Sequence, residues 1–152
     1  MGMGEPLLNL ENVQAAVEII SSEIGLSLTA RHVTVSTAGV VPGIMRLADS
    51  GLKVNLAISL NSGVEEKRRK LMPIARKYSL AQLKEAARYF AVRRKRRVTF
   101  EYILFAGIND SREDARALAE YVRGIPCKIN LLAYNEVASL PYRRPGEAVV
   151  NE

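Results

Sequence analysis

Residues 54–61 read Val-Asn-Leu-Ala-Ile-Ser-Leu-Asn, a nearly continuous apolar run that ends in a serine and an asparagine. Such a run is typical of a strand that helices cover on both faces, in a parallel sheet or in the wall of a barrel. Three more strands are predicted from alternation and from β-branched or aromatic content, over 32–37, 98–105 and 128–132. Because helical segments separate these strands, the order predicts a parallel α/β architecture.

Four helices are predicted from apolar spacing, capping residues and stop residues. The first begins after Asn9 and ends before Gly25, and the second begins at Pro42 and ends at Gly51. The third begins after Ser79 and ends in the run 93–97, and the fourth begins at Arg112 and ends at Arg123. Ser79 with Gln82 and Ser111 with Asp114 have the spacing of capping boxes. Four parallel strands do not close a barrel, so the sheet is either open or part of a barrel.

The composition is that of one globular domain, because 152 residues, 48% hydrophobic and 25% charged, can bury a single core. No apolar run approaches the ~20 residues that a membrane span needs, and the first residues do not have the pattern of a signal peptide. We therefore expect a cytoplasmic protein with no membrane partner. Cys127 is the single cysteine, which excludes an internal disulfide, and its neighbours predict a strand in which the thiol acts as a small hydrophobe.

Positive charge is concentrated in one region of the sequence. The net charge is +6, and 13 of the 22 basic residues lie between Lys67 and Arg97, where Glu85 is the only acid. Such a field favours polyanions and predicts salt-dependent binding of a phosphate backbone, so nucleic acid is the expected partner. The alternative is a solvated helical face followed by a basic loop. Part of the run 93–97 also fits the end of a helix, where cations are favourable without any ligand.

Polar side chains follow the predicted strands at their carboxyl ends. Ser36 ends the first strand, Ser59 and Asn61 end the second, and Asn135 follows the last. Open parallel sheets and barrels both bind ligands at this edge. Each residue alone fits a turn or a helix cap, but their convergence on one edge favours a ligand site.

The N-terminal segment adds two features to that edge. Gly2 and Gly4 would let a ligand approach the backbone, and Glu5 offers a carboxylate to an ammonium or hydroxyl group. The segment lacks the lysine and hydroxyl of a phosphate-binding loop, which argues against a nucleoside triphosphate. His32 lies at the other end of its strand and is assigned to structure. Glu101 lies within a strand, so we expect it to face outward or to pair with a buried Arg or Lys.

Seven ordered blocks of the chain resemble the radical S-adenosylmethionine (SAM) RNA adenine-C2 methyltransferases of the RlmN family. The blocks are MGMGEPLLN (1–9), RHVTVSTAGVVP (31–42), LAISLN (56–61), LMPI (71–74), FEY (100–102), GINDS (107–111) and PCKINL (126–131). They extend the resemblance from Met1 to about Pro145. The resemblance implies that residues 1–145 are a partial radical SAM (β/α) barrel domain truncated at both ends, and that residues 146–152 are a tail.

Carried over by position, the resemblance implies SAM as cofactor and names the residues that contact it. Gly4 and Glu5 would lie around the methionyl amino group, and the other contacts would be Ser36, Ser59, Leu60, Asn61 and Asn135. Asn61 stands where many members have histidine, and Ala133 with Tyr134 replaces the usual residues before Asn135. An asparagine both donates and accepts hydrogen bonds, so we expect its contact to survive.

The family's activity depends on cysteines that this sequence does not contain. In the full-length enzyme the resemblance implies a [4Fe-4S] cluster that cleaves SAM, a 5′-deoxyadenosyl radical, and methyl transfer through a methylated cysteine to adenine C2. The cluster loop, the two catalytic cysteines and an N-terminal RNA-recognition region have no counterpart among these 152 residues. We assign no catalytic and no metal-binding residue here, and we predict a chain that is iron-free and inactive alone.

The implied partners are ribosomal RNA, in its 23S form, and transfer RNA as a second substrate. Unpaired sheet edges also favour self-association. Three alternatives remain open: a related methyltransferase of adenine C8, a non-catalytic RNA-binding module, and a sugar-phosphate barrel enzyme. The last ranks lowest because the strand ends offer no convergent lysine and acid pair.

Overall fold

A four-stranded parallel sheet forms the centre of the computed structural model, which describes residues 4–150. The strands are β1 (Thr34–Thr37), β2 (Asn55–Ser59), β3 (Val98–Leu104) and β4 (Cys127–Ala133), and they lie in the order β1-β2-β3-β4. All neighbouring pairs are parallel. The predicted α/β class, with about four parallel strands and flanking helices, is therefore confirmed.

The predicted helices are also present. The α-helices are α1 (Leu10–Ser21), α2 (Val41–Asp49), α3 (Glu65–Leu71), α4 (Leu80–Arg94), α5 (Arg112–Val122) and α6 (Glu147–Val150). Both capping boxes form, at the N-termini of α4 and α5. Three short 3-10 helices complete the chain: η1 (Pro6–Leu8), η2 (Ala30–His32) and η3 (Pro73–Arg76). Two helices were not predicted: α3, which is mostly charged and too short to show an apolar period, and α6, which lies within the segment assigned to the tail.

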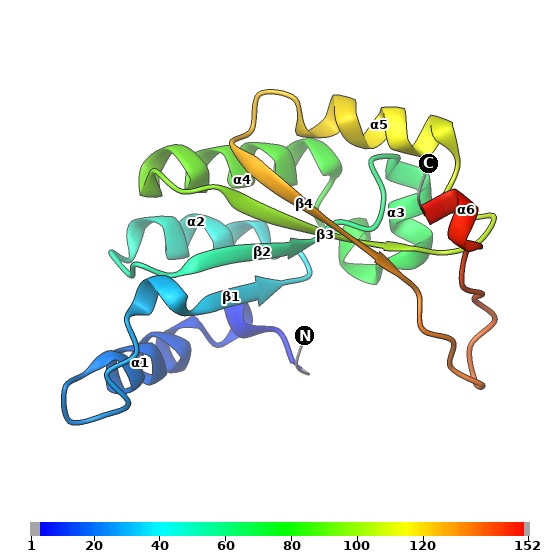
Figure 1. The fold of residues 1–152 in the computed structure, drawn as a ribbon. Coiled ribbons are helices and arrows are strands. Elements are labelled where there is room, and N and C mark those ends of the chain that lie inside the picture. Colours follow the sequence, from blue (N-terminus) through cyan, green and yellow to red (C-terminus); the bar gives the residue numbers. More distant parts are fainter. Residues whose placement is uncertain (1–3, 151–152) are drawn as a thin grey trace.

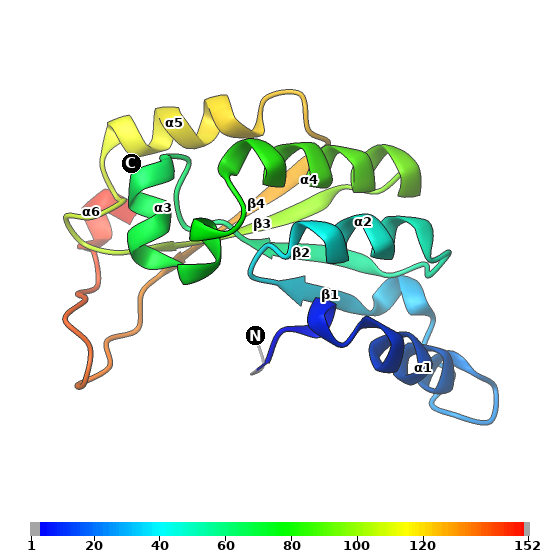
Figure 2. The same ribbon diagram turned by 180° about the vertical axis from the view of Figure 1, so that it is seen from behind.

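Helices cover one face of the sheet and leave much of the other open. Figures 1 and 2 show α2 and α4 along the covered face and α1 beside the edge strand β1. In β3, Val98, Phe100, Tyr102 and Leu104 are buried, whereas the alternating residues between them are partly exposed. The two-sided cover expected for the apolar run at 54–61 is therefore incomplete, because Asn55 and Ser59 at the ends of β2 are only half-buried on the open face.

The fold corrects one sequence interpretation, the placement of His32, and decides between the two alternatives given for Glu101. His32 belongs to η2 and not to a strand, because its N–H donates to the carbonyl of Thr29 at 2.8 Å in a 3-10 turn. Glu101 lies half-exposed on β3, as expected of an outward-facing residue, and its carboxylate accepts from the side-chain amide of Asn130 at 2.8 Å. Gly2 lies outside the described residues.

The strand register places the predicted site residues on neighbouring strands. Ser36 pairs with Ala57 of β2, and Ser59 pairs with Glu101 of β3. Parallel strands lie ~4.8 Å apart and their side chains alternate between the two faces. Ser36, Ser59 and Glu101 therefore share the open face near the carboxyl ends of the strands.

None of the helices within residues 4–150 is both long enough and apolar enough to cross a bilayer.

Candidate functional site

Glu5 lies at the carboxyl end of β1 and is held there by two backbone groups. One carboxylate oxygen accepts from the N–H of Leu7 at 3.1 Å and caps η1, and the other accepts from the N–H of Ala38 at 2.8 Å. Each oxygen keeps a further lone pair, so the carboxylate can also accept from an ammonium group. Gly4 precedes it with a φ of +90° and open space around it, which would let a ligand reach the backbone.

Ser36 and Ser59 present hydroxyl groups that the rest of the described chain leaves unused. Both are half-buried on the open face, and neither side chain hydrogen bonds to another residue within 4–150. A hydroxyl that is placed by a strand but has no protein partner is available to a ligand. With Glu5, these serines form a set of polar groups at the carboxyl ends of β1 and β2, which we call the rim.

Leu60 and Asn61 continue β2 beyond the rim, but their groups are already engaged. The N–H of Leu60 donates to the carbonyl of Glu101 at 2.9 Å. Asn61 is left-handed at φ +57°, and its side-chain oxygen accepts from the N–H of Ile103 at 2.9 Å. Its amide nitrogen contacts the sulfur of Met72 at 3.5 Å. The side chain of Asn61 thus joins β2 to β3, and its contact with a cofactor stays a prediction.

Asn109 is a buried residue of this region that sequence reasoning missed. Its amide donates to the carbonyls of Asn61 at 2.7 Å and Ile103 at 2.8 Å, and its oxygen accepts from the N–H of Phe105 at 2.7 Å. All its side-chain polar atoms are therefore used to tie the end of β2 to the end of β3. In the sequence, Asn109 belongs to the GINDS block, which supported the family resemblance but did not indicate that its side chain joins two strands.

Arg68 was also missed, because it is hidden within the basic stretch. It is fully buried, and its guanidinium donates to the carbonyl of Ala38 at 2.9 Å and that of Leu60 at 3.2 Å. Burial lowers the pKa of Arg68 below its usual value. Arg68 thereby joins the ends of β1 and β2 and stabilises the rim. Because it is buried, the basic stretch is not a uniformly solvated surface.

Asn135 follows β4 and is exposed, with its side-chain oxygen 3.4 Å from a guanidinium nitrogen of Arg144. Beside it, Tyr134 packs against Phe105 at a ring separation of 4.8 Å, and Tyr142 packs on the same Phe105 at 4.9 Å. The departure from the family pattern at Tyr134 is therefore part of an aromatic cluster that holds the segment after β4 against the end of β3.

The side chains of this chain do not fit an iron-sulfur cluster. Within residues 4–150, no three His, Cys, Asp or Glu side chains gather in a way that could hold a metal ion. Cys127 begins β4, at the end of the sheet away from the rim, and burial raises the pKa of its thiol. A cluster needs several thiolates, and one protonated thiol at the wrong end cannot supply them.

The sequence model of the radical SAM superfamily matches residues 1–119, most of the chain and the whole of the segment that carries Glu5, Ser36 and Ser59. The chain belongs to the radical SAM superfamily. The resemblance to the RlmN family is confirmed as well. A probable dual-specificity RNA methyltransferase RlmN of Clostridium botulinum is 46% identical over all 152 residues. The dual-specificity RNA methyltransferase RlmN of an Anaeromyxobacter species is 53% identical over the same length. This radical SAM chain spans 44% and 40% of those two relatives.

Solved structures agree with the assignment. The crystal structure of a radical SAM methyltransferase from Sphaerobacter thermophilus superposes with a TM-score of 0.96 at 42% identity, and it covers 99% of this chain and 44% of that one. A domain of a pyruvate-formate lyase-activating enzyme from Bacteroides vulgatus has a TM-score of 0.68 at 19% identity, covering 99% of this chain and 86% of that one. The second likeness shows a shared fold alone.

Proposed function

We propose that this chain binds SAM at the rim and forms the cofactor-binding part of an RNA methyltransferase that modifies adenine C2. The observation that carries the proposal is the placement of Glu5 with the hydroxyls of Ser36 and Ser59, which have no partner within residues 4–150, at the carboxyl ends of adjacent parallel strands. The similarity to RlmN proteins along the entire length of this chain supports it. SAM supplies the methyl group and, in radical enzymes, the precursor of the adenosyl radical.

The residues of the rim would bind and orient the cofactor. Glu5, fixed by Leu7 and Ala38, would accept from the methionyl ammonium. The hydroxyls of Ser36 and Ser59 would hydrogen bond to polar groups of the cofactor on the open face. Gly4 and the backbone of Leu60 would line its approach, and Asn135 would contact it from the end of β4. We propose 23S ribosomal RNA as the methyl acceptor and transfer RNA as a second one.

The iron-sulfur cluster is assigned to parts of a longer enzyme, because the single cysteine here does not fit it. This chain alone is therefore proposed to bind the cofactor without turning it over. A second candidate function is a non-catalytic RNA-binding module, which is favoured by the same lack of cluster ligands and by the positive net charge of +6.

Titration calorimetry with SAM distinguishes the two candidates. The rim proposal predicts saturable SAM binding that weakens about tenfold in the double variant Ser36→Ala/Ser59→Ala. The variant removes two hydrogen bonds of about 1 kcal/mol each, and the expected loss is somewhat less than their sum because the two contacts are coupled. Thr29→Ala removes an exposed hydroxyl beside η2 and is the matched control, with no expected effect. An absence of binding by the parent chain would favour the RNA-binding module.

A further inference from the structure

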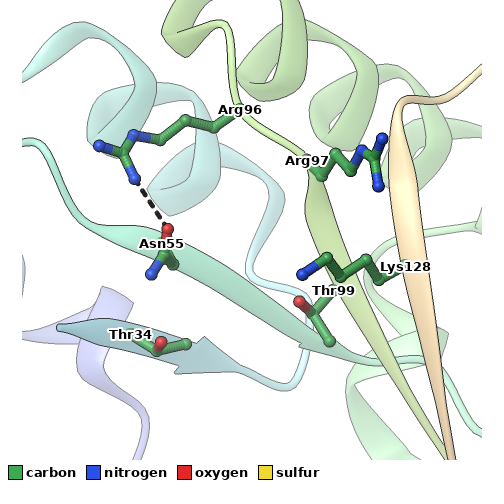
Figure 3. Close-up of a pocket in the computed structure, with 6 residues that line it drawn as sticks. All are labelled: Thr34, Asn55, Arg96, Arg97, Thr99 and Lys128. Carbon is green, nitrogen blue, oxygen red and sulfur yellow. Dashed lines mark hydrogen bonds between the residues drawn. The ribbon is translucent and has the colours of Figure 1, made fainter. Parts of the chain in front are cut away.

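A pocket with a volume of about 410 Å³ lies at the other end of the sheet from the rim, where the strands begin. Figure 3 shows that its lining comes from β1, β2, β3 and β4 and from the turn before β3. The lining residues are Thr34, Asn55, Arg96, Arg97, Thr99 and Lys128. Three of these six are cations and none is an acid, so the pocket carries a concentrated positive charge.

Two of the three cations have no side-chain partner among the described residues. Arg97 and Lys128 are both exposed, and neither forms an ion pair or hydrogen bond through its side chain within residues 4–150. In Figure 3 the amine of Lys128 extends towards the hydroxyl of Thr99 on the neighbouring strand. The hydroxyls of Thr34 and Thr99 also have no partner in the described part of the chain. The pocket therefore holds both charge and free hydrogen-bond donors.

Arg96 is the third cation, and it is held in place. Its guanidinium donates to the side-chain oxygen of Asn55 at 2.9 Å, and the amide of Asn55 in turn donates to the carbonyl of Arg31 at 2.8 Å. The asparagine is thereby fixed with its oxygen towards Arg96. One contact with a neutral amide occupies one of the five donors of the guanidinium and leaves its charge uncompensated.

Several other cations of the basic stretch are already used by the protein. Arg93 pairs with Asp49 at 3.2 Å, and Lys67 pairs with Asp114 at 2.7 Å. Arg94 donates to the carbonyls of Gly51 and Leu52. The fold therefore separates the charges that the sequence places side by side. Arg96 and Arg97 lie in one pocket with Lys128, which comes from a distant segment of the chain.

We propose that this pocket binds a phosphate group, and that its source is the backbone of the RNA. Guanidinium groups, an ammonium and hydroxyls are the donors that bind phosphate oxygens, and an acid-free lining does not repel the anion. The choice of RNA as the source rests on the proposed function. The pocket and the rim lie on the same face, about 7–13 Å apart along the strands at ~3.3 Å per residue, because Thr34 and Ser36 are two residues apart on β1 and Asn55 and Ser59 are four apart on β2. One RNA chain could thus be contacted at both ends of the sheet.

The test compares two variants of equal charge by fluorescence anisotropy with a labelled single-stranded RNA. Arg97→Gln/Lys128→Gln removes two cations from the pocket. Lys53→Gln/Lys95→Gln removes two exposed cations at the same end of the sheet but outside the lining, and is the control. The pocket variant should bind RNA about tenfold more weakly and lower the slope of log K against log salt by about 1.4, whereas the control should change affinity less than about threefold.

A second measurement follows the backbone amides of Thr34, Thr99 and Lys128 by NMR while inorganic phosphate is added. Saturable shifts in the parent chain that disappear in the pocket variant support the phosphate site. If these shifts occur while RNA affinity is the same in all three proteins, the site takes a small phosphate and RNA is the wrong source. Equal losses of RNA affinity in the pocket variant and the control, or no amide shifts with phosphate, would overturn the proposal that the pocket binds phosphate. Failure of SAM binding would leave these results unchanged, so the two proposals fail separately.

Discussion

The carboxylate of Glu5 accepts a hydrogen bond at 2.8 Å from the backbone N–H of Ala38, 33 residues further along the chain. The same carboxylate caps η1 through Leu7. One acidic side chain therefore fixes both the N-terminal segment and the end of β1, and it does so at the edge where parallel sheets bind ligands.

Glu5→Gln should weaken both the fold and the cofactor site. One oxygen is replaced by an NH₂ group that faces a backbone N–H, which leaves two donors opposed. We expect a loss of about 1 kcal/mol in the free energy of unfolding, measured with urea, and a loss of at least about tenfold in SAM affinity. Glu11→Gln, an exposed residue in the first turn of α1, is the control. Unchanged SAM binding by Glu5→Gln would contradict the role given to the carboxylate.

Asn109→Ala should be strongly destabilising. The substitution removes the side chain that hydrogen bonds to the buried carbonyls of Asn61 and Ile103 and to the N–H of Phe105. At about 1 kcal/mol or more for each unsatisfied group, we expect a loss of about 3 kcal/mol in urea unfolding. Asn130→Ala, on the exposed strand β4, removes one half-exposed contact and should cost under about 1 kcal/mol. Equal losses in the two variants would contradict the tie between β2 and β3.

Gly43→Ala tests the support of the N-terminal segment. A Cβ on Gly43 in α2 would lie 2.6 Å from the Cβ of Leu7, which is fully buried. The overlap should cost about 1–3 kcal/mol and exceed the gain of about 1 kcal/mol in helix propensity, with weaker SAM binding because Glu5 is displaced. Gly146→Ala, with open space around the added methyl, is the control. A stabilised Gly43→Ala variant that binds SAM normally would show that η1 packs differently.

The unfolding free energy should fall steeply above pH 10. Burial raises the pKa of Tyr102 and of Tyr121 well above the usual value of about 10. Below that value both states keep the proton. Above it the unfolded chain releases protons that the folded chain retains, so each tyrosine should lower stability by about 1.4 kcal/mol per pH unit. The hydroxyl of Tyr121 has no partner in the described chain, so Tyr121→Phe should halve this slope at little cost near pH 7. A slope unchanged by Tyr121→Phe would contradict the assignment.

Local signals in the sequence predicted most of the fold. The apolar run at 54–61, the alternation in β3 and the capping boxes of α4 and α5 each depend on neighbours along the chain, and each appears where expected. His32 was misplaced because a 3-10 turn and the start of a strand have no distinct periodicity over so few residues. Helix α3 was missed for the same reason.

The site could be predicted only in part. Strand-end residues such as Ser36 and Ser59 follow from topology, because parallel strands bring their carboxyl ends together. Asn109 and Arg68 could not be found, because their roles depend on contacts with carbonyls that are distant in the sequence. For the basic stretch the sequence suggested one continuous positive surface, because its charges are adjacent along the chain. In the fold, some of these charges form ion pairs, Arg68 is buried, and Arg96 and Arg97 line the pocket.

The most direct test of the central claim is a map of backbone amide shifts during titration of this chain with SAM. The account predicts that the largest saturable shifts fall at Glu5, Ser36, Ala38, Ser59 and Leu60, and that the amides of Arg97 and Lys128 remain unchanged. Shifts confined to the amino ends of the strands, or no saturable shifts at all, would contradict cofactor binding at the rim.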